Sequence, residues 1–142
     1  MPLAINLRPN ERLIVNGVVI QNSTAAAKLL IHNAAAVLRE KDIITEAGAT
    51  TPARRIYFAI QCKYLFPGKD ATYLPLIYQF IEEFETAAPS TAAITREVRR
   101  HVDEGALYQA LKSAKQLISR EQEILNGFPG KPLPDANDAA AG

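Results

Sequence analysis

Cysteine is almost absent from this chain of 142 residues, since Cys62 is the only one. No intramolecular disulfide can form, and we expect a cytoplasmic location because disulfides are rare in that compartment. Long apolar runs are missing too, and none approaches the ~20 residues that a membrane-spanning helix needs. The first residues lack the basic start and long apolar stretch of a signal peptide. The chain is long enough for one domain with a real hydrophobic core.

An excess of charge of either sign is also lacking. Lysine and arginine together number 16, aspartate and glutamate number 15, and the formal net charge is +1. A protein without an overall positive field can bind nucleic acid only through a local basic patch. Such a function must therefore be sought in the arrangement of particular side chains.

The motifs of the common enzyme classes are missing as well. The sequence has no glycine-rich phosphate loop, no paired cysteines or histidines at metal-ligand spacing, and no nucleophile elbow. His32 lies at the end of a predicted strand and His101 on a helix with an apolar stripe, so we interpret both as structural. Cys62 lies in a helix rich in aromatic residues, which indicates a small buried side chain. We therefore expect a protein with no catalytic residues, no bound metal and no cofactor.

Residues 1–48 carry the pattern of short β-strands. Apolar residues alternate with polar or small ones over 3–7, and apolar residues flank Asn16-Gly17, the strongest hairpin signal because both residues accept a positive φ. Two further strands are expected over 28–32 and 35–38. The pattern predicts a small antiparallel sheet or sandwich. Such a unit is marginal alone, so it must pack against the helices or another subunit.

From Thr51 onward the apolar residues recur with the period of helices. Thr51 suits an N-cap and Pro52 suits the first helical position, which predicts a helix over 52–66 with apolar residues on two sides. A second helix is expected from near Thr72, with Pro75 in its first turn because proline does not fit a helix interior. Two more helices are expected, over 91–104 and 107–126.

After Phe128 the composition changes to proline, glycine, alanine and aspartate, which cannot bury enough apolar area to offset the entropy of ordering. The sequence therefore predicts an α+β fold. A small N-terminal antiparallel β unit over 1–48 and a four-helix C-terminal half over 49–127 are expected to form one folded domain. A disordered tail is expected over 128–142.

Basic side chains form two groups. The first lies in or beside the N-terminal half and comprises Arg8, Arg12, Arg39, Lys41, Arg54 and Arg55. Arg54 and Arg55 lie at a helix N-terminus, where the dipole prefers anions, so they indicate an external anionic partner or carboxylates elsewhere in the fold. The second group, Arg96, Arg99 and Arg100, has Asp103 and Glu104 close by and is interpreted as local helical ion pairs. Three acidic residues expected to face water, Glu82, Glu83 and Glu85, could also neutralise either group.

Short links join the segments that carry the first basic group. Folding could therefore gather these side chains into a patch that contacts phosphates. Tyr57, Phe58 and Tyr64 lie on the same predicted helix as Arg54 and Arg55. They could stack on unpaired bases, although aromatic residues at helical spacing more often lie in a core.

Several stretches of the chain resemble one bacterial family. They are 38–43 (LREKDI), 51–59 (TPARRIYFA), 1–3 (MPL), 7–12 (LRPNER), 15–17 (VNG) and 105–112 (GALYQALK). In this order, and over about residues 1–126, the chain is similar to the flagellum biosynthesis repressor family (FlbT) of flagellated alphaproteobacteria. The tail lies outside the resemblance.

The resemblance implies a non-enzymatic, post-transcriptional regulator. It implies action on the 5′ untranslated leader of flagellin messenger RNA, whose stability or translation is lowered while the flagellum is incomplete. It also implies a partner that works in opposition, the flagellin-synthesis activator protein FlaF. Some relatives act as activators, so the sign of regulation stays open. The resemblance supplies no set of RNA-contact residues.

A second, shorter similarity points in the same direction. Residues 8–17 and 38–43 are similar in order and spacing to the carbon storage regulator family, small β dimers that bind messenger leaders, although no helical half like this one belongs to that family. There an Arg-Glu pair after the last strand lies in the RNA-binding region, and here it matches Arg39-Glu40. This similarity favours Arg8 and Arg39 as contacts, and a dimer.

We therefore expect an RNA-binding repressor that forms a homodimer or larger homo-oligomer, acts away from membranes, and contacts phosphates through Arg8, Arg39, Lys41, Arg54 and Arg55. The alternative is a protein-interaction module that binds another flagellar regulator such as FlaF, or flagellin, with indirect effects on messenger RNA. One contiguous positive face supports RNA binding. Interleaved charge beside an apolar groove supports a protein partner.

Overall fold

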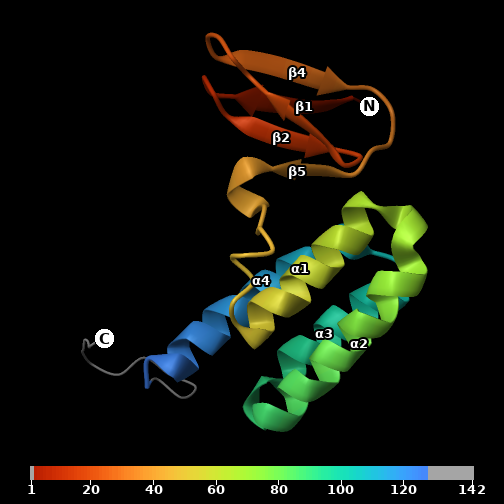
Figure 1. Ribbon diagram of the computed structural model, residues 1–142, viewed down its shortest axis with the longest axis vertical. Coiled ribbons are helices and arrows are strands. Elements are labelled where there is room, and N and C mark those ends of the chain that lie inside the picture. Colours follow the sequence, from red (N-terminus) through yellow and green to blue (C-terminus); the bar gives the residue numbers. More distant parts are fainter. Residues whose placement is uncertain (1, 128–142) are drawn as a thin grey trace.

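The computed structural model describes residues 2–127, apart from the side chain of Asp70. A β unit lies at one end of the long axis and four helices lie at the other (Figure 1). The predicted α+β fold, with its β unit first and four helices after it, is confirmed. The predicted disordered tail over 128–142 lies outside the described residues. No helix within residues 2–127 is long and apolar enough to cross a membrane.

The β unit consists of two small antiparallel sheets. Its strands are β1 (Leu3–Leu7), β2 (Arg12–Val15), β3 (Val18–Gln21), β4 (Ala27–Ile31) and β5 (Val37–Arg39). One sheet pairs β1 with β4, and the other has the order β3-β2-β5. Ile5 and Leu7 of the first sheet share a small core with Leu13 and Val37 of the second. The unit is therefore a miniature sandwich, one of the two arrangements expected from the sequence.

The β2–β3 hairpin turns at Asn16 and Gly17, as predicted. Both residues have positive φ, 51° and 84° respectively. Val15 and Val18 flank the turn as a cross-strand pair, which makes this a two-residue hairpin loop. A side chain at Gly17 would meet the ring of Phe66, because an added Cβ would lie 2.8 Å from it. Gly17 thus serves both the turn and the close approach of the helical half.

The helical half contains α1 (Pro52–Leu65), α2 (Asp70–Ala87), α3 (Ala92–Asp103) and α4 (Leu107–Leu125). The described part of the chain also has three short 3-10 turns. The turn η1 (Glu40–Asp42) directly follows β5, whereas η2 (Pro67–Lys69) leads into α2 and η3 (Pro89–Thr91) leads into α3. Thr51 is the N-cap of α1, as expected, and its hydroxyl oxygen accepts a hydrogen bond from the Arg54 N–H at 3.3 Å. Pro52 follows as the first helical residue.

The expectation that Pro75 lies in the first turn of its helix is wrong. Pro75 lies inside α2, because η2 leads directly into a helix that begins at Asp70. More than one turn of α2 therefore precedes Pro75. Proline has no N–H, so one regular backbone hydrogen bond of the helix is missing at this position. Pro75 is exposed, so its ring lies on the solvent side of the helix.

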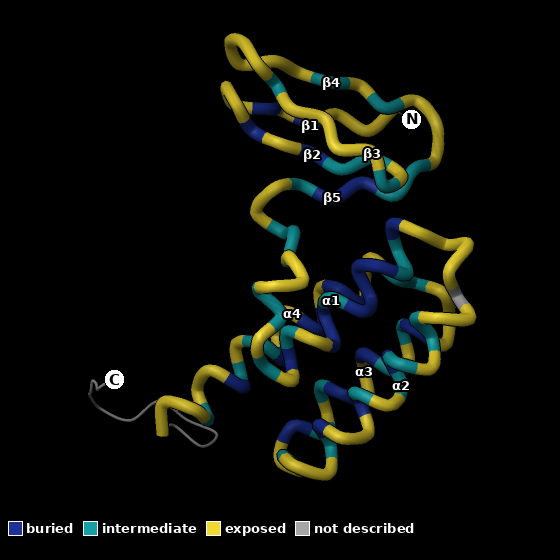
Figure 2. Tube along the Cα trace, viewed as in Figure 1, coloured by how far each residue is buried: buried dark blue, intermediate teal, exposed yellow. Residues whose placement is uncertain are grey.

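The first helix is covered on two sides, as predicted. It packs against α2 and α4, and α3 packs against α4. Figure 2 shows α1 as the most continuously buried helix. The largest fully buried apolar side chains of the helical core are Tyr57, Leu38, Ile56, Ile60, Ile77, Ile81, Leu117 and Val98. Tyr57 is thus a core residue with 1% exposure, which confirms the core interpretation for this aromatic.

Three polar side chains of α1 hold the segment that leaves the β unit. The Tyr64 hydroxyl accepts from the Val37 N–H at 3.1 Å and donates to the Val37 carbonyl at 3.2 Å. The Tyr57 hydroxyl donates to the Asp42 carbonyl at 2.7 Å. The Gln61 amide bonds both the N–H and the carbonyl of Ile44, at 2.9 and 2.8 Å. These contacts fix η1 and its flanks against α1.

Candidate nucleic-acid interface

Arg8 and Arg39 meet around one carboxylate at the end of the β unit. The Arg39 guanidinium lies 3.6 Å from Glu11 and donates to the Asn6 carbonyl at 2.7 Å. Arg8 lies 3.9 Å from the same carboxylate, and its backbone N–H donates to Glu11 at 2.8 Å. That backbone hydrogen bond, helped by the charges of Arg39 and Arg8, lowers the pKa of Glu11 below its usual value. The fold therefore already uses part of this positive charge.

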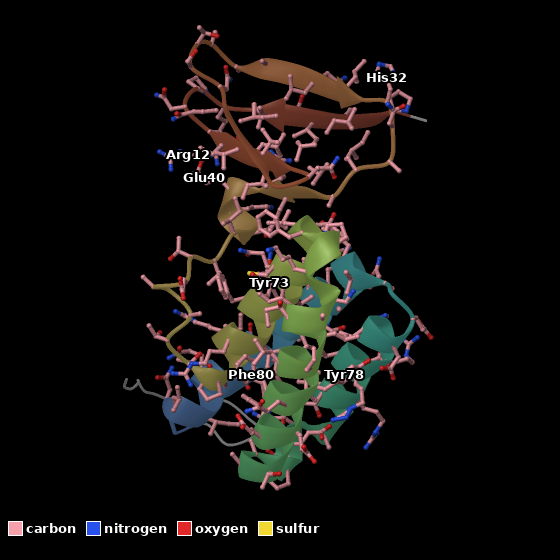
Figure 3. The ribbon with its side chains drawn as sticks, turned by 45° about the vertical axis from the view of Figure 1, so that its right-hand side comes forward. Arg12, His32, Glu40, Tyr73, Tyr78 and Phe80 are labelled. Carbon is pink, nitrogen blue, oxygen red and sulfur yellow. The ribbon has the colours of Figure 1, made fainter. Side chains whose placement is uncertain are left out.

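Arg12 follows Glu11 in the chain, and its backbone lies beside η1. Its backbone N–H donates to the Glu40 carboxylate at 2.7 Å, which ties β2 to the 3-10 turn, and the two side chains lie together at the edge of the β unit (Figure 3). Glu40 is therefore occupied in holding the backbone, although the matching Arg-Glu pair of the carbon storage regulators lies in an RNA-binding region.

Lys41 and Arg54 come together at the junction between the β unit and the helices. Both line a hollow between η1, the loop before α1 and α4, and Lys115 of α4 lines it with them. A second hollow beside it is lined by Lys41, Lys115 and also Lys112. A third hollow lies between β1, β5 and the helices, and Arg39 is the basic residue in its lining. Asp42 lines all three hollows, which we together call the junction groove.

The junction groove is mainly positive. Arg39, Lys41, Arg54, Lys112 and Lys115 line it, whereas Asp42 is the one carboxylate on its walls. Asp42 forms an ion pair with Lys115 and is itself only 12% exposed. The other four basic side chains, Arg39, Lys41, Arg54 and Lys112, form no ion pair with a carboxylate of the groove. Arg39 contacts Glu11, which lies outside the groove lining.

An exposed aromatic ring lies between the second and third hollows of the groove. Tyr108, near the start of α4, is 44% exposed and lines both. The Lys112 ammonium lies 5.3 Å from the centre of its ring, and the ring of Tyr64 packs beside it at 6.2 Å. A ring held next to basic side chains is the usual combination for stacking unpaired bases.

Arg55 lies on another side of α1 from Arg54. It lines an apolar hollow with Phe80, Phe84 and Ile124, and Glu121 also reaches this hollow. Glu121 is buried, and its carboxylate accepts from the Ala53 N–H at 3.0 Å. A carboxylate from α4 thus stabilises the N-terminus of α1 through a backbone N–H.

Two members of the second basic group, Arg99 and Arg100, form ion pairs as interpreted, but with partly different partners. Arg100 pairs with Glu97 at 2.7 Å and Glu104 at 3.3 Å. Arg99 pairs with Glu85 at 2.9 Å, so the expectation that Glu85 faces water is wrong. Glu85 is half-buried because α2 turns this side towards α3, where its carboxylate also accepts from the Thr95 hydroxyl at 2.8 Å.

Cys62 is buried, as expected, and burial raises the pKa of its thiol. His101 is half-buried and lies 3.3 Å from Glu97, one helical turn away. Within residues 2–127, no group of three or more histidine, cysteine, aspartate or glutamate side chains is placed to hold a metal ion.

The family model described as "Flagellar protein FlbT" matches residues 3–125. The chain belongs to the FlbT family. The probable flagellum biosynthesis repressor protein FlbT of Rhodopseudomonas palustris (strain TIE-1) is 40% identical over 126 residues, which cover 89% of this chain and 99% of that protein. The flagellum biosynthesis repressor protein FlbT of Caulobacter vibrioides (strain ATCC 19089) is 36% identical, with 88% and 90% covered. The probable FlbT of Mesorhizobium japonicum is 33% identical, with 93% and 92% covered.

No solved structure matches this FlbT family member. The family match confirms the resemblance found in the motifs 38–43 and 51–59. Its range includes both the β unit and the four helices.

Sequence reasoning missed three residues of the junction groove, Tyr108, Lys112 and Lys115. Lys112 and Lys115 are three residues apart, which places them on one side of a helix. This spacing could have indicated a basic side of the last helix. The sequence does not show, however, that this side of α4 faces η1 and the β unit, which lie far away along the chain. Lys115 meets Asp42 across a separation of 73 residues.

Proposed function

We propose that this FlbT family member regulates flagellin expression by binding the 5′ untranslated leader of flagellin messenger RNA. Binding lowers the stability or translation of the messenger during flagellum assembly. The names of the curated relatives, flagellum biosynthesis repressors, support a regulatory role in flagellar gene expression. The observation that carries the RNA step is the junction groove, with its basic lining and exposed Tyr108.

The proposed contact set follows the groove. Arg39, Lys41 and Arg54 line it together with Lys112 and Lys115 of α4, and Arg8 adjoins Arg39 through Glu11. These side chains neutralise phosphates, and the ring of Tyr108 stacks on an unpaired base. Arg55 lies outside the groove, so we propose that it contacts RNA only where the strand continues around the N-terminus of α1.

Direct binding of purified protein to a labelled flagellin leader tests this proposal, with a scrambled RNA of equal length as the comparison and several salt concentrations. The double variant Lys41→Ala with Arg54→Ala removes two proposed phosphate contacts. We expect weaker binding and a salt slope reduced by about 1.4, since each contact to single-stranded nucleic acid contributes about 0.7. Arg55→Ala is expected to have a smaller effect.

The matched control is Arg96→Ala, which removes an exposed positive charge from α3. This variant should bind RNA with unchanged affinity and salt slope. Equal binding of leader and scrambled RNA would contradict the recognition of a leader. An unchanged affinity for the double variant, with the fold intact by circular dichroism, would contradict the assignment of the junction groove.

The apolar hollow beside Arg55 supports a second candidate function, the binding of a protein partner. The hollow beside Arg55 is lined mainly by apolar side chains from α2 and α4, including Leu125, which is 65% exposed. Under this proposal, the hollow binds a FlaF-type activator or flagellin, and effects on the messenger are indirect.

Mixing the purified protein with a FlaF-type protein or flagellin, and measuring binding by calorimetry, tests the second candidate. Leu125→Asp should abolish such binding and leave RNA binding unchanged. If neither protein binds, this candidate fails. If both RNA and a protein bind at separate surfaces, competition experiments show whether the partner displaces the messenger.

A further inference from the structure

The β3 strand is an edge strand with exposed apolar side chains. It is the outer member of the sheet ordered β3-β2-β5, and all four of its residues are exposed (Figure 2). Val18 is 61% exposed, Val19 63% and Ile20 37%. Edge strands are usually protected from pairing by lysine, proline or a bulge. The β3 strand has no charged residue and no proline, and its pairing with β2 is one-to-one throughout.

Both sides of β3 continue an apolar surface that is buried elsewhere in the molecule. Val18 and Ile20 lie opposite Val15 and Leu13, so they share the side of the sheet that forms the core of the β unit. Val19 lies opposite Ile14, on the side that packs against the helical core. The opposing β1–β4 sheet has only two strands, and Val18 and Ile20 are left open to solvent.

The free backbone groups of β3 can be assigned from its hairpin. In a two-residue loop, the flanking residues Val15 and Val18 exchange both hydrogen bonds, and the next such pair is Leu13 with Ile20. The Asn16 N–H instead donates to the Ala36 carbonyl at 2.8 Å, on the β5 side, which agrees with this alternation. The N–H and carbonyl groups of Val19 and Gln21 therefore point out of the sheet edge.

We propose that β3 pairs with β3 of a second copy of this chain, antiparallel and about a two-fold axis at Ile20. Val19 then exchanges two hydrogen bonds with the partner's Gln21, and Gln21 does the same with the partner's Val19. All the outward-pointing groups of both strands are satisfied, and a six-stranded sheet of order β5-β2-β3-β3-β2-β5 results. This is a closed, isologous contact.

Three features indicate that the strand pairing with the free edge of β3 comes from a second copy of this chain. The free groups are spaced so that the strand is complementary to itself. The strand is uncharged, so a copy meets it without like-charge repulsion. A two-fold axis perpendicular to the sheet keeps the sides of the sheet aligned. Val18 and Ile20 of both copies therefore lie on one side and join the two small β cores, which explains how a β unit of this size gains a larger core.

Sedimentation or light scattering over a range of concentrations, combined with Val19→Lys, tests the proposal. The Val19 side chain is exposed and its backbone groups point away from β2, so this substitution leaves the hairpin intact. We expect the wild type to be a dimer and Val19→Lys to be a monomer with the same circular dichroism. The matched control is Leu30→Lys on β4, which is 53% exposed and should stay dimeric.

Cysteine cross-linking tests the register independently. Two Ile20→Cys strands face each other at the axis as a non-hydrogen-bonded pair, with Cα atoms about 4.5 Å apart, within the range for a disulfide. Val18→Cys on the same strand is the control, because the two Val18 positions would lie about 13 Å apart along the strands. Under mild oxidation we expect a cross-linked dimer for Ile20→Cys and none for Val18→Cys. The native Cys62 is buried.

A wild type that stays monomeric at all concentrations would overturn the proposal, as would a dimer that Val19→Lys leaves intact. Loss of the dimer in Leu30→Lys alone would place the contact on the β1–β4 sheet. A monomeric wild type whose edge binds a strand of another protein, in a manner abolished by Val19→Lys, would assign β3 to that protein and also reject self-pairing.

Discussion

Asp42 is the residue at which the fold and the junction groove meet. Its backbone carbonyl is held by Tyr57, and its carboxylate pairs with Lys115. The carbonyl contact fixes η1 against α1, whereas the carboxylate only lowers the positive charge of the groove. Substitution of the carboxylate can therefore change the electrostatics of the groove and keep the backbone contact.

Asp42→Asn should strengthen RNA binding. It removes one negative charge from the groove and releases Lys115 from an ion pair of a type usually worth about 0.2–1 kcal/mol, so an affinity up to about fivefold higher is expected. Binding titrations at several salt concentrations should also show a steeper salt dependence. Glu104→Gln, which removes an exposed charge that pairs with Arg100, is the control. Weaker or unchanged binding would show that phosphates do not enter this part of the groove.

The lowered pKa of Glu11 should make the free energy of unfolding depend on pH. Its pKa in the folded state is lowered from 4.5, chiefly by the hydrogen bond from the Arg8 N–H. A carboxylate with a lowered folded pKa stabilises the fold fully above its unfolded pKa, and this contribution is lost as the pH falls through the lower folded value. Glu11→Gln should therefore be less stable than the wild type at neutral pH, and the difference should shrink below pH 4.5. Urea unfolding across this range checks it, and a difference independent of pH would reject it.

At the scale of elements, α1 organises the molecule. Thr51 and Glu121 supply acceptors for its first N–H groups, and its apolar sides pack on α2 and α4. Tyr57, Gln61 and Tyr64 reach from the same helix to the segment that links it with the β unit. A single helix thus forms the middle of the core and positions one wall of the junction groove.

Tyr64→Phe should destabilise the protein by about 1–3 kcal/mol, because it leaves the buried N–H and carbonyl of Val37 without their partner. Urea unfolding followed by circular dichroism measures this. Tyr108→Phe is a matched control, since it removes the hydroxyl of an exposed tyrosine beside Tyr64, and it should change stability by less than about 0.5 kcal/mol. Equal effects of the two substitutions would mean that the hydroxyl contacts of Tyr64 contribute little.

At the scale of the whole molecule, the β unit and the helical half share apolar contacts. Leu38 of β5 is 1% exposed and belongs to the helical core, and Ile14 of β2 packs against the same core. The apolar core that belongs to the β unit alone contains four buried residues. The stability of the β unit must therefore depend on the helices, on another copy, or on both.

We expect the β unit and the helical half to unfold in a single transition. Hydrogen exchange under native conditions should give the amides of β2 and β5 protection similar to that of α1, because opening either part would expose the shared Leu38 contact. Amides of β2 and β5 that exchange well before those of α1 would contradict one folded domain. Repeating the measurement on Val19→Lys separates the contribution of the proposed dimer from that of the helices.

Much of the local structure could be predicted from short stretches of sequence. Alternating apolar residues located the strands, Asn16-Gly17 located a hairpin, and Thr51-Pro52 located the start of α1. These signals are local because they depend on side-chain periodicity and on the φ angles that a residue accepts. Pro75 was misplaced because the helix start depends on the preceding 3-10 turn, whose continuation into α2 has no strong sequence signal.

The sequence by itself determined the α+β order, the family and the residue types available for a basic site. Only the tertiary structure decided which of those residues meet. It separates Arg54 from the adjacent Arg55, turns Glu85 to Arg99, and brings Lys115 to Asp42 from 73 residues away. The physical reason is that the rotation of each helix about its axis is set by packing between elements. No short stretch of sequence encodes which side of one helix will face another.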